Sequence, residues 1–215
     1  DKAVRLWTAD GKSLRTLFGH TAQVTDVVWS PDGQRLASAS ADKNVRLWNP
    51  NGKELATLDG HNQTVTTLAW SPDGKILASG AQDNDVRLWD VSLNNAAKPL
   101  ATLDGHSAPI TALAWSPNSK LLASGAQDHT VRLWQSDATS LGTLGGRNEL
   151  NGIIAWSPDG KMLATGTYSN KIELWSPEKH LLTIMSGHSD AITGLAWSGD
   201  GSRLASGGKD SAVRL

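Results

Sequence analysis

The stretch GHNQTVTTLAWSPDGKILASGAQDNDVRLWD, residues 60–90, decides the fold of this chain, because it recurs with changes along the whole sequence. The phrase VRLW or IELW ends in Trp7, Trp48, Trp89, Trp134 and Trp175. The phrase VVW, LAW or IAW ends in Trp29, Trp70, Trp115, Trp156 and Trp197. All ten tryptophans thus occupy two positions of one repeat, whose period is 41 residues and is lengthened once to 45. Such a period indicates a repeat architecture.

One period predicts four short β-strands separated by turns. TVTTLAWS alternates apolar and small polar residues, and SPDG places a proline and a glycine where a tight turn favours them. KILASGA and DVRLW follow as a second and a third strand, and KPLATL as a looser fourth. A helical period of useful length is missing from the sequence. The repeat therefore predicts an all-β fold made of small antiparallel sheets.

The strands are predicted at the same phase of each period. First strands are expected at 24–30, 65–71, 110–116, 152–157 and 192–198. Second strands are expected at 35–40, 76–81, 121–126, 162–167 and 203–208. Third strands are expected at 44–48, 85–89, 130–134 and 171–175, with further third strands at 1–7 and 211–215 and an outer strand at 12–17. The third strand is apolar on both faces, as Val86, Leu88 and Trp89 show, so each sheet has to pack between neighbours, which favours radial stacking.

These residues resemble the WD-repeat family of β-propellers over the whole length of the chain. The resemblance rests on four marks at fixed offsets: Gly-His, Ser-Pro-Asp-Gly, an Asp six residues before a Trp, and a Ser four residues before that Asp. It implies four-stranded blades, in which the strand after Gly-His lines a central channel and the strand before it lies outermost.

The resemblance also implies a hydrogen-bonded network of His, Ser, Asp and Trp inside each blade. The matching sets are His20/Ser38/Asp42/Trp48, His61/Ser79/Asp83/Trp89, His106/Ser124/Asp128/Trp134 and His188/Ser206/Asp210, the last without its Trp. A catalytic or metal-binding role would require these groups to converge, whereas they recur one period apart. We therefore interpret them as structural, because buried polar groups have to be satisfied, and we predict neither catalytic nor metal-ligating residues.

The five periods are predicted to form one domain, residues 1–215, that begins and ends in the middle of a blade. Propellers of this family mostly close with seven blades, so we expect the chain to be part of a seven-bladed ring whose remaining blades are supplied by a longer chain. The alternative is a ring of five blades in which residues 1–17 complete the blade begun by residues 192–208. Direct strand pairing between residues 3–6 and 203–208 would distinguish the two arrangements.

Composition excludes several classes of partner and chemistry. The formal net charge is −1 and no block of like charges occurs, so neither nucleic acid nor a membrane surface is expected as a partner. The absence of cysteine removes a disulfide framework, a thiolate zinc site and a cysteine nucleophile, and it fits a cytoplasmic location. No apolar run approaches the length of a membrane span. No cofactor is predicted.

The candidate partner-binding residues lie on the rim formed by the loops after Gly-His and by the tight turns. They are Tyr168, Arg147, Lys209, Gln82, Gln127 and Glu149. The fourth period departs from the pattern, with Arg147 in place of His and Ser169 in place of Asp. This is either a tolerated degenerate repeat or a loss that frees Arg147 and Tyr168 for a partner, since exposed Tyr and Arg are favoured interface anchors. His129 and His180 are expected to be solvated.

The sequence thus predicts a non-catalytic protein–protein interaction scaffold that binds a protein or peptide. The alternative is a sensor or regulatory propeller domain of a larger signalling or NTPase protein, whose catalytic domain lies outside this chain. An enzymatic role for these residues ranks below both, because no convergent set of acid, base or metal ligands is present.

Overall fold

The computed structural model describes residues 1–92, 97–144 and 150–215, and in these ranges all regular secondary structure is β-strand. The chain divides into two compact units, Asp1–Asp104 and Gly105–Leu215. A helix with the length and apolar character needed to span a membrane is found in none of the described ranges.

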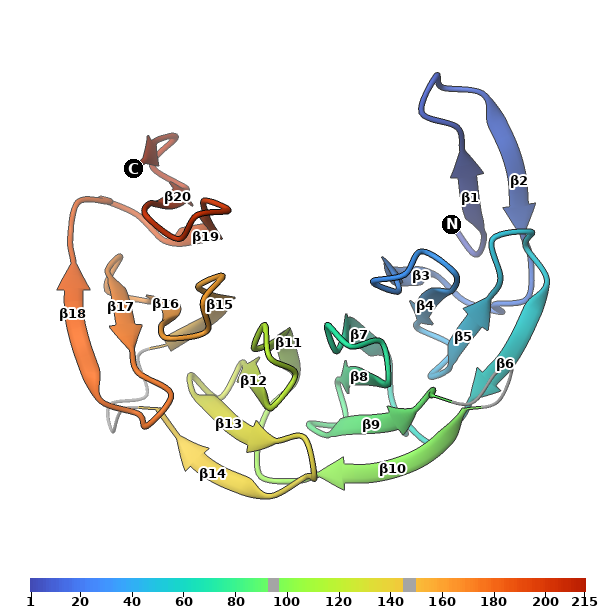
Figure 1. Ribbon diagram of the computed structural model, residues 1–215, viewed down its shortest axis with the longest axis horizontal. Coiled ribbons are helices and arrows are strands. Elements are labelled where there is room, and N and C mark those ends of the chain that lie inside the picture. The colour runs from blue at the N-terminus through green and yellow to red at the C-terminus, as the bar shows by residue number, and fades with distance from the viewer. Residues whose placement is uncertain (93–96, 145–149) are drawn as a thin grey trace. The chain divides into compact units, whose positions relative to one another are not determined.

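The first unit contains three antiparallel sheets whose strands follow one another in chain order (Figure 1). A two-stranded sheet is formed by β1 (Val4–Trp7) and β2 (Ser13–Leu17). The next sheet has four strands: β3 (Val24–Trp29), β4 (Leu36–Ser40), β5 (Val45–Trp48) and β6 (Glu54–Leu58). The last also has four: β7 (Val65–Trp70), β8 (Ile76–Ala81), β9 (Val86–Asp90) and β10 (Lys98–Leu103).

The second unit also contains three antiparallel sheets in chain order. The first has β11 (Ile110–Trp115), β12 (Leu121–Ala126), β13 (Val131–Gln135) and β14 (Ser140–Thr143). The second has β15 (Leu150–Trp156), β16 (Leu163–Thr167), β17 (Ile172–Trp175) and β18 (Leu181–Met185). The third has β19 (Ile192–Trp197), β20 (Leu204–Gly208) and β21 (Val213–Arg214). The predicted four-stranded antiparallel blades are confirmed.

The Ser-Pro-Asp-Gly phrase forms the turn between the first and second strands of a sheet. In the turn after β7, the backbone N–H of Ser71 donates to the carbonyl of Ile76, and that of Gly74 donates to the carbonyl of Ser71, both at 2.8 Å. The Ser71 hydroxyl donates to Asp73 at 2.6 Å. Gly74 has a φ of 70°, a left-handed conformation that glycine adopts without steric cost. The turn residues therefore fix the register of β7 and β8.

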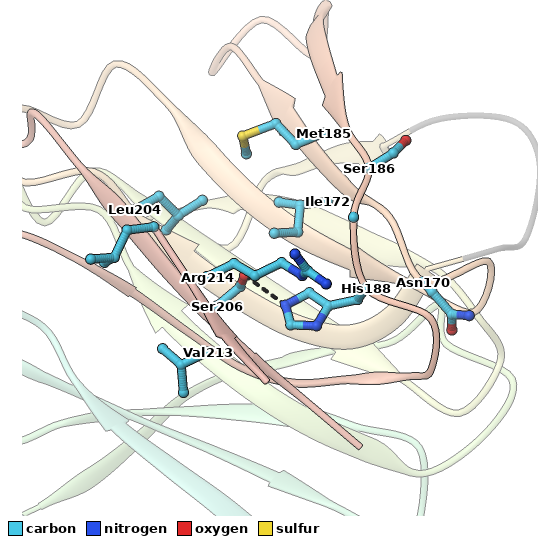
Figure 2. A pocket seen from close by; sticks show the side chains of 11 residues that line it. Asn170, Ile172, Met185, Ser186, His188, Leu204, Ser206, Val213 and Arg214 are labelled. Carbon is cyan, nitrogen blue, oxygen red and sulfur yellow. Dashed lines mark hydrogen bonds between the residues drawn. The ribbon is translucent and has the colours of Figure 1, made fainter. Parts of the chain in front are cut away.

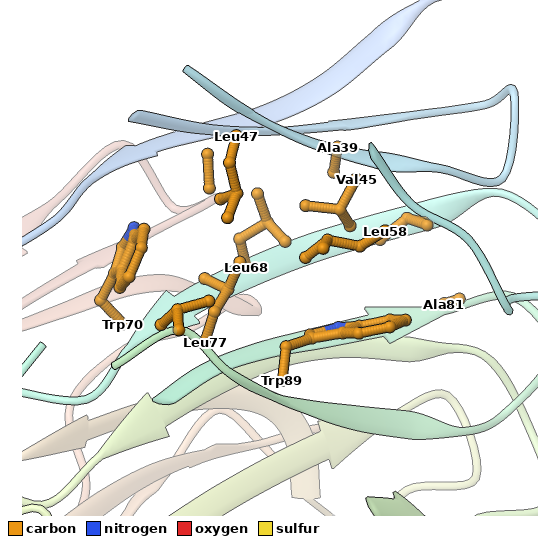
Figure 3. Close-up of a cluster of buried hydrophobic side chains, with 12 residues drawn as sticks. Ala39, Val45, Leu47, Leu58, Leu68, Trp70, Leu77, Ala81 and Trp89 are labelled. Carbon is orange, nitrogen blue, oxygen red and sulfur yellow. The ribbon is translucent and has the colours of Figure 1, made fainter. Parts of the chain in front are cut away.

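The apolar core of each unit lies between neighbouring sheets. In the first unit, Leu47 and Leu58 of one sheet belong to the same buried cluster as Leu68, Leu77 and Trp89 of the next (Figure 3). In the second unit, a corresponding cluster joins β13 to β15, β16 and β17. Burial of apolar side chains on both faces of a sheet stabilises it by roughly 25 cal/mol per Å² removed from water. This arrangement agrees with the stacking of sheets predicted from the sequence.

The tryptophans that end the first strands, in the phrases LAW and IAW, link neighbouring first strands by hydrogen bonds. In the first unit, the indole N–H of Trp70 donates to the carbonyl of Val28 at 3.2 Å. In the second unit, Trp156 donates to the carbonyl of Ala114 and Trp197 to that of Ala155, both at 3.1 Å. Trp recurs at this position because its ring can pack against the neighbouring blade and donate a hydrogen bond to that blade at the same time.

Strand β15 departs from the predicted range 152–157, because it begins at Leu150 and contains a bulge. Its pairing with β16 steps from Leu150 opposite Thr167 to Ile154 opposite Thr165. Gly152 lies inside this bulge with a φ of 75°, and a Cβ there would collide with the hydroxyl of Thr111. Gly152 thus continues the strand through a bulge where the neighbouring blade approaches closely.

Candidate functional site

Each network joins a loop, two strands and a tight turn of one blade. In the blade of β7–β10, His61 lies in the loop before β7, Ser79 on β8, Asp83 in the turn after β8, and Trp89 on β9. Nε2 of His61 lies 2.8 Å from the Ser79 hydroxyl, and Nδ1 lies 3.0 Å from Oδ2 of Asp83. The indole N–H of Trp89 donates to the same hydroxyl at 2.9 Å.

The structure brings the other predicted network residues together in the same way. His20 and His106 bind their Ser and Asp partners at 2.8–2.9 Å, and Trp48 and Trp134 donate to Ser38 and Ser124 at 2.8 Å. In the last blade, His188 lies 2.9 Å from both Ser206 and Asp210. That network has three members instead of four, as the sequence predicts.

The chemistry of the partners sets the direction of every hydrogen bond in a complete network. An indole N–H only donates and an ionised carboxylate only accepts. Nδ1 of the histidine must therefore donate to the aspartate. The serine oxygen accepts from the indole, and its own proton goes to Nε2. With a neutral imidazole in this tautomer, every proton in a complete network has an acceptor.

Burial favours the neutral ring of His61 and His106, and hydrogen bonds favour the ionised carboxylates of the aspartates. Burial lowers the pKa of His61 and His106 below its usual value, although the neighbouring carboxylates oppose the shift. Burial raises the pKa of Asp83, but the hydrogen bonds from the backbone N–H of Asn62 and from His61 oppose it, and the pKa is lowered. Hydrogen bonds from His188 and the backbone of Ser189 lower the pKa of Asp210 to about 2.

The glycine before the histidine has a backbone conformation that other residues rarely adopt, with a φ of 152° at Gly60 and 147° at Gly105, and it lies against an arginine of the third strand. A Cβ on Gly60 would lie 2.9 Å from Nη1 of Arg87, and one on Gly105 would lie 2.9 Å from Nη1 of Arg132. Cβ atoms essentially never approach another atom so closely, so the arginine would have to move. The Gly-His phrase therefore combines a close backbone contact with a buried hydrogen-bonding ring.

The four networks lie in four different blades, and their histidine side chains are at most 2 % exposed. A buried imidazole whose two nitrogens are both engaged cannot reach a substrate. Across residues 1–92, 97–144 and 150–215, no three His, Cys, Asp or Glu side chains gather in a way that could hold a metal ion. The geometry suits a structural role for these residues.

The fourth blade, formed by β15–β18, has shorter hydrogen-bond chains in place of the network. Trp175 donates to the hydroxyl of Thr165 at 3.1 Å, in the place that serine occupies elsewhere. The hydroxyls of Thr167 and Ser169 lie 3.0 Å apart. Arg147, which stands where the other blades have histidine, lies outside the described residues, and so does Glu149.

The rim position before the turn aspartate has a fixed backbone and an outward side chain. The backbone N–H of Gln82, Gln127 and Lys209 donates at 2.8–2.9 Å to a carbonyl in the loop after Gly-His. All three residues are exposed. Gln82 lies in the first unit, and Gln127 and Lys209 lie in the second. These predicted partner-binding residues therefore project into solvent from an ordered frame.

Tyr168 occupies the same rim position in the fourth blade, and 54 % of its surface is exposed. Its ring makes an edge-to-face contact with the ring of His129, with centroids 4.6 Å apart and an angle of 84° between the planes. Such aromatic pairs contribute about 0.5–1.5 kcal/mol beyond area burial. The contact joins the tight turns of two neighbouring blades of the second unit.

His129 is a residue that the sequence reasoning missed. The sequence predicts a solvated side chain. His129 is exposed, but its ring also contacts Tyr168, which the sequence did not predict. Its φ of 65° places it in a left-handed turn position that Lys43, Asn84, Asn170 and Ser211 occupy in the other blades. The repeat alignment could have placed His129 on the rim, but the contact depends on the spacing of two blades, which the pattern of one repeat does not contain.

Four-stranded antiparallel blades with His–Ser–Asp–Trp networks define the class of WD-repeat β-propellers. The profile of the WDR19 first beta-propeller matches residues 1–153, which is more than half of the chain, and that of the WD domain, G-beta repeat, matches residues 139–176 and 179–215. The chain belongs to the family of the WDR19 first beta-propeller, and its propeller fold and its resemblance to WD-repeat proteins are thereby confirmed.

Curated relatives match this chain over the length of one repeat. Nuclear distribution protein nudF 2 of Talaromyces marneffei is 43% identical over 42 residues. Nuclear distribution protein PAC1 of Arthroderma benhamiae and that of Trichophyton verrucosum are each 54% identical over 43 residues. Each match covers 20% of this chain and only 9% of the relative. The similarity therefore concerns the repeat and not the whole relative.

Proposed function

We propose that this chain is a non-catalytic scaffold that binds a protein or peptide on the rim of its second unit, around Tyr168. WD-repeat propellers typically mediate protein interactions and lack catalysis of their own. The buried networks support a structural role for the groups that most resemble an acid–base site, because their polar atoms are bonded to one another.

One observation carries the proposal: Tyr168 is exposed but held in place by the ring of His129. A partner that buries such a side chain loses less conformational entropy than with an isolated ring, because the contact with His129 already restricts it. Tyrosine is also enriched among the residues that dominate binding energy at interfaces. Gln127 and Lys209 are exposed at the same position of the flanking blades and supply polar groups beside it.

The neutral polar character of this rim fits a protein or peptide better than a nucleic acid. The formal net charge of the chain is −1, whereas phosphate backbones are bound mainly by clustered Lys and Arg. Arg147 and Glu149 stay predicted members of the site. A cytoplasmic location stays a prediction from the absence of cysteine.

The test is affinity capture with the purified chain, followed by quantitative mass spectrometry. We expect Tyr168→Ala combined with Arg147→Ala to lose the specifically bound protein and to weaken its measured Kd at least tenfold. Leu182→Ala is the matched control, because Leu182 is similarly exposed, at 52 %, but lies on the outer strand β18 of the same blade. Normal affinity in the double variant would place the binding site elsewhere.

A further inference from the structure

Two glycines bring two neighbouring blades of the second unit, β11–β14 and β15–β18, into backbone contact. A Cβ on Gly125 in β12 would lie 2.7 Å from the Cα of Gly152 in the bulge of β15, and 2.9 Å from its carbonyl oxygen. A Cβ on Gly152 would collide with the hydroxyl of Thr111 on β11. Both glycines are buried. A side chain at either position would therefore have to push the two blades apart.

The glycine in β15 distinguishes this first strand from the others. The other first strands carry threonine at the same repeat position: Thr25, Thr66, Thr111 and Thr193. In three of them the hydroxyl donates to a glycine carbonyl on the second strand of the same blade, at 3.0–3.3 Å. Gly152 has no hydroxyl, and its φ of 75° is one that a β-branched residue almost never adopts. The fourth blade thus has a close approach to its neighbour where the other blades have a side chain.

Short stretches of strand connect this contact to two tight turns on the rim. Gly125 is the last residue but one of β12, and the turn that follows β12 carries His129. On the other side, β15 pairs with β16 at Leu150 opposite Thr167, and Tyr168 follows Thr167 directly. The centroids of the Tyr168 and His129 rings are 4.6 Å apart, near the lower end of the range for aromatic pairs. The contact of the two rings therefore depends on the distance between β12 and β15.

We propose that Gly125 and Gly152 are positioning residues of the rim, which place the ring of Tyr168 against His129 by letting the two blades touch. The inference rests on the proposed function where it concerns binding, whereas the placement of the rings is a property of the chain alone. Both glycines are buried, so they act on a partner through Tyr168 and not by direct contact. If the blades separate, the ring of Tyr168 is less restricted, and ordering it on binding costs affinity.

Gly125→Ala separates the blades with little other disturbance, because Gly125 does not have a positive φ. The added methyl group requires a shift of roughly 0.7 Å before its distance to Gly152 reaches the 3.4 Å of ordinary contact. We would record the His129 ring protons by NMR in the full chain, with Tyr168→Leu as the reference without an aromatic ring. The displacement that an aromatic ring causes falls steeply with distance. The His129 signals should therefore move at least about a quarter of the way to their Tyr168→Leu positions.

Gly207→Ala is the matched control, because Gly207 stands at the same repeat position in β20. A Cβ there would meet the hydroxyl of Thr193 at 3.9 Å, which is ordinary contact. Gly207 follows Ser206, whose hydroxyl is bonded to Nε2 of His188 at 2.9 Å (Figure 2). The His129 signals should not move in this variant. Equal movement in both alanine variants, or no movement in Gly125→Ala, overturns the proposal.

Gly152→Thr tests the contact from the other strand, with the residue that the other first strands carry. Because threonine almost never adopts a φ of 75°, β15 has to rearrange, and the His129 signals should move further than in Gly125→Ala. A folded Gly152→Thr chain with unchanged His129 signals would also overturn the proposal. If this variant does not fold, the result for Gly125→Ala decides.

The affinity for the captured partner distinguishes this inference from the proposed function. We expect Gly125→Ala to weaken the measured Kd roughly two- to tenfold, the cost of ordering one side chain, and Gly207→Ala to bind normally. Moved His129 signals with an unchanged Kd would contradict binding at Tyr168 and leave the positioning role intact. Unmoved signals, together with a Kd that Tyr168→Ala weakens, would overturn the positioning role alone.

Discussion

At the scale of the residue, the histidine networks illustrate how a group suited to catalysis becomes structural. His61 has a carboxylate on one ring nitrogen and a hydroxyl on the other, with spacings that an acid–base site would also show. Its side chain is only 1 % exposed, and the hydroxyl is shared with Trp89. The imidazole therefore connects a loop, a strand and a turn, and its hydrogen bonds stabilise the blade.

Replacing His61 tests this role. We expect His61→Ala to lower the free energy of unfolding by about 1–3 kcal/mol, because Asp83 and Ser79 lose a buried partner. His180→Ala is the matched control, since His180 is exposed, and it should change stability by less than about 0.5 kcal/mol. Chemical denaturation of both variants gives the two values. Equal effects would contradict a structural role for His61.

Stability should decrease in mild acid. The pKa of His61 and His106 is lowered in the folded state, so the unfolded chain binds protons more readily than the folded chain below about pH 6.5. Their contribution is present above that pH and is lost as the pH falls through the folded pKa. We expect Tm to fall between pH 7 and pH 5, and to fall less steeply in a His61→Asn, His106→Asn variant. An unchanged slope in that variant would contradict a lowered pKa for the two histidines.

At the scale of the element, side chains on first strands tie neighbouring blades together. In the first unit, Asp26 on β3 accepts the backbone N–H of Leu68 on β7 at 2.8 Å, and the Thr25 hydroxyl donates to the carbonyl of Val65 at 2.6 Å. Burial raises the pKa of Asp26 despite the hydrogen bonds from Leu68 and Val27. Keeping the Asp26 carboxylate ionised at this contact between two blades therefore costs free energy of folding.

Two variants of Asp26 separate its charge from its hydrogen bond. Because the folded pKa is raised, ionisation near pH 7 reduces stability, and Asp26→Asn removes the charge while its one amide oxygen can still accept from Leu68 and gives up the bond from the adjacent N–H of Val27. We expect Asp26→Asn to keep or raise the free energy of unfolding at pH 7. Asp26→Ala should lower it by about 1–2 kcal/mol, because the N–H loses its acceptor. Equal losses in both variants would show that the carboxylate itself is required.

The sequence predicts the elements well because each strand is encoded by one period. The turn SPDG and the phrase VRLW mark strand ends locally, so β7, β8 and β9 lie within a residue of their predicted ranges. Features that depend on two blades were not predictable from the pattern of one repeat. The bulge at Gly152, the hydrogen bond of Asp26 to Leu68 and the contact of His129 with Tyr168 are of this kind.

At the scale of the whole molecule, the number of blades stays a prediction. The resemblance to WD-repeat propellers implies seven blades. In the five-bladed alternative, β1 would occupy the place beside β20. Within the second unit, β21 pairs with β20 through Ser206 opposite Arg214 and Gly207 opposite Val213.

A spin-label distance tests the blade number. Because the chain contains no cysteine, Lys2→Cys and Lys209→Cys would carry the only two labels, both on exposed positions. Direct pairing of the strands near these sites would bring the backbones within about 5 Å. Stacked sheets lie about 10 Å apart, so an arrangement that lacks two blades separates the labels by more than about 20 Å. A single short distance would establish five-bladed closure.

The central claim is that a partner binds on the rim at Tyr168, and amide hydrogen exchange of the chain with and without its captured partner tests it most directly. Binding at this rim predicts slower exchange in residues 127–130 and 167–171, which carry the His129 and Tyr168 turns. Exchange in the outer strands β14 and β18 should not change. Protection confined to the outer strands, with unchanged exchange at the two turns, would contradict binding at the rim.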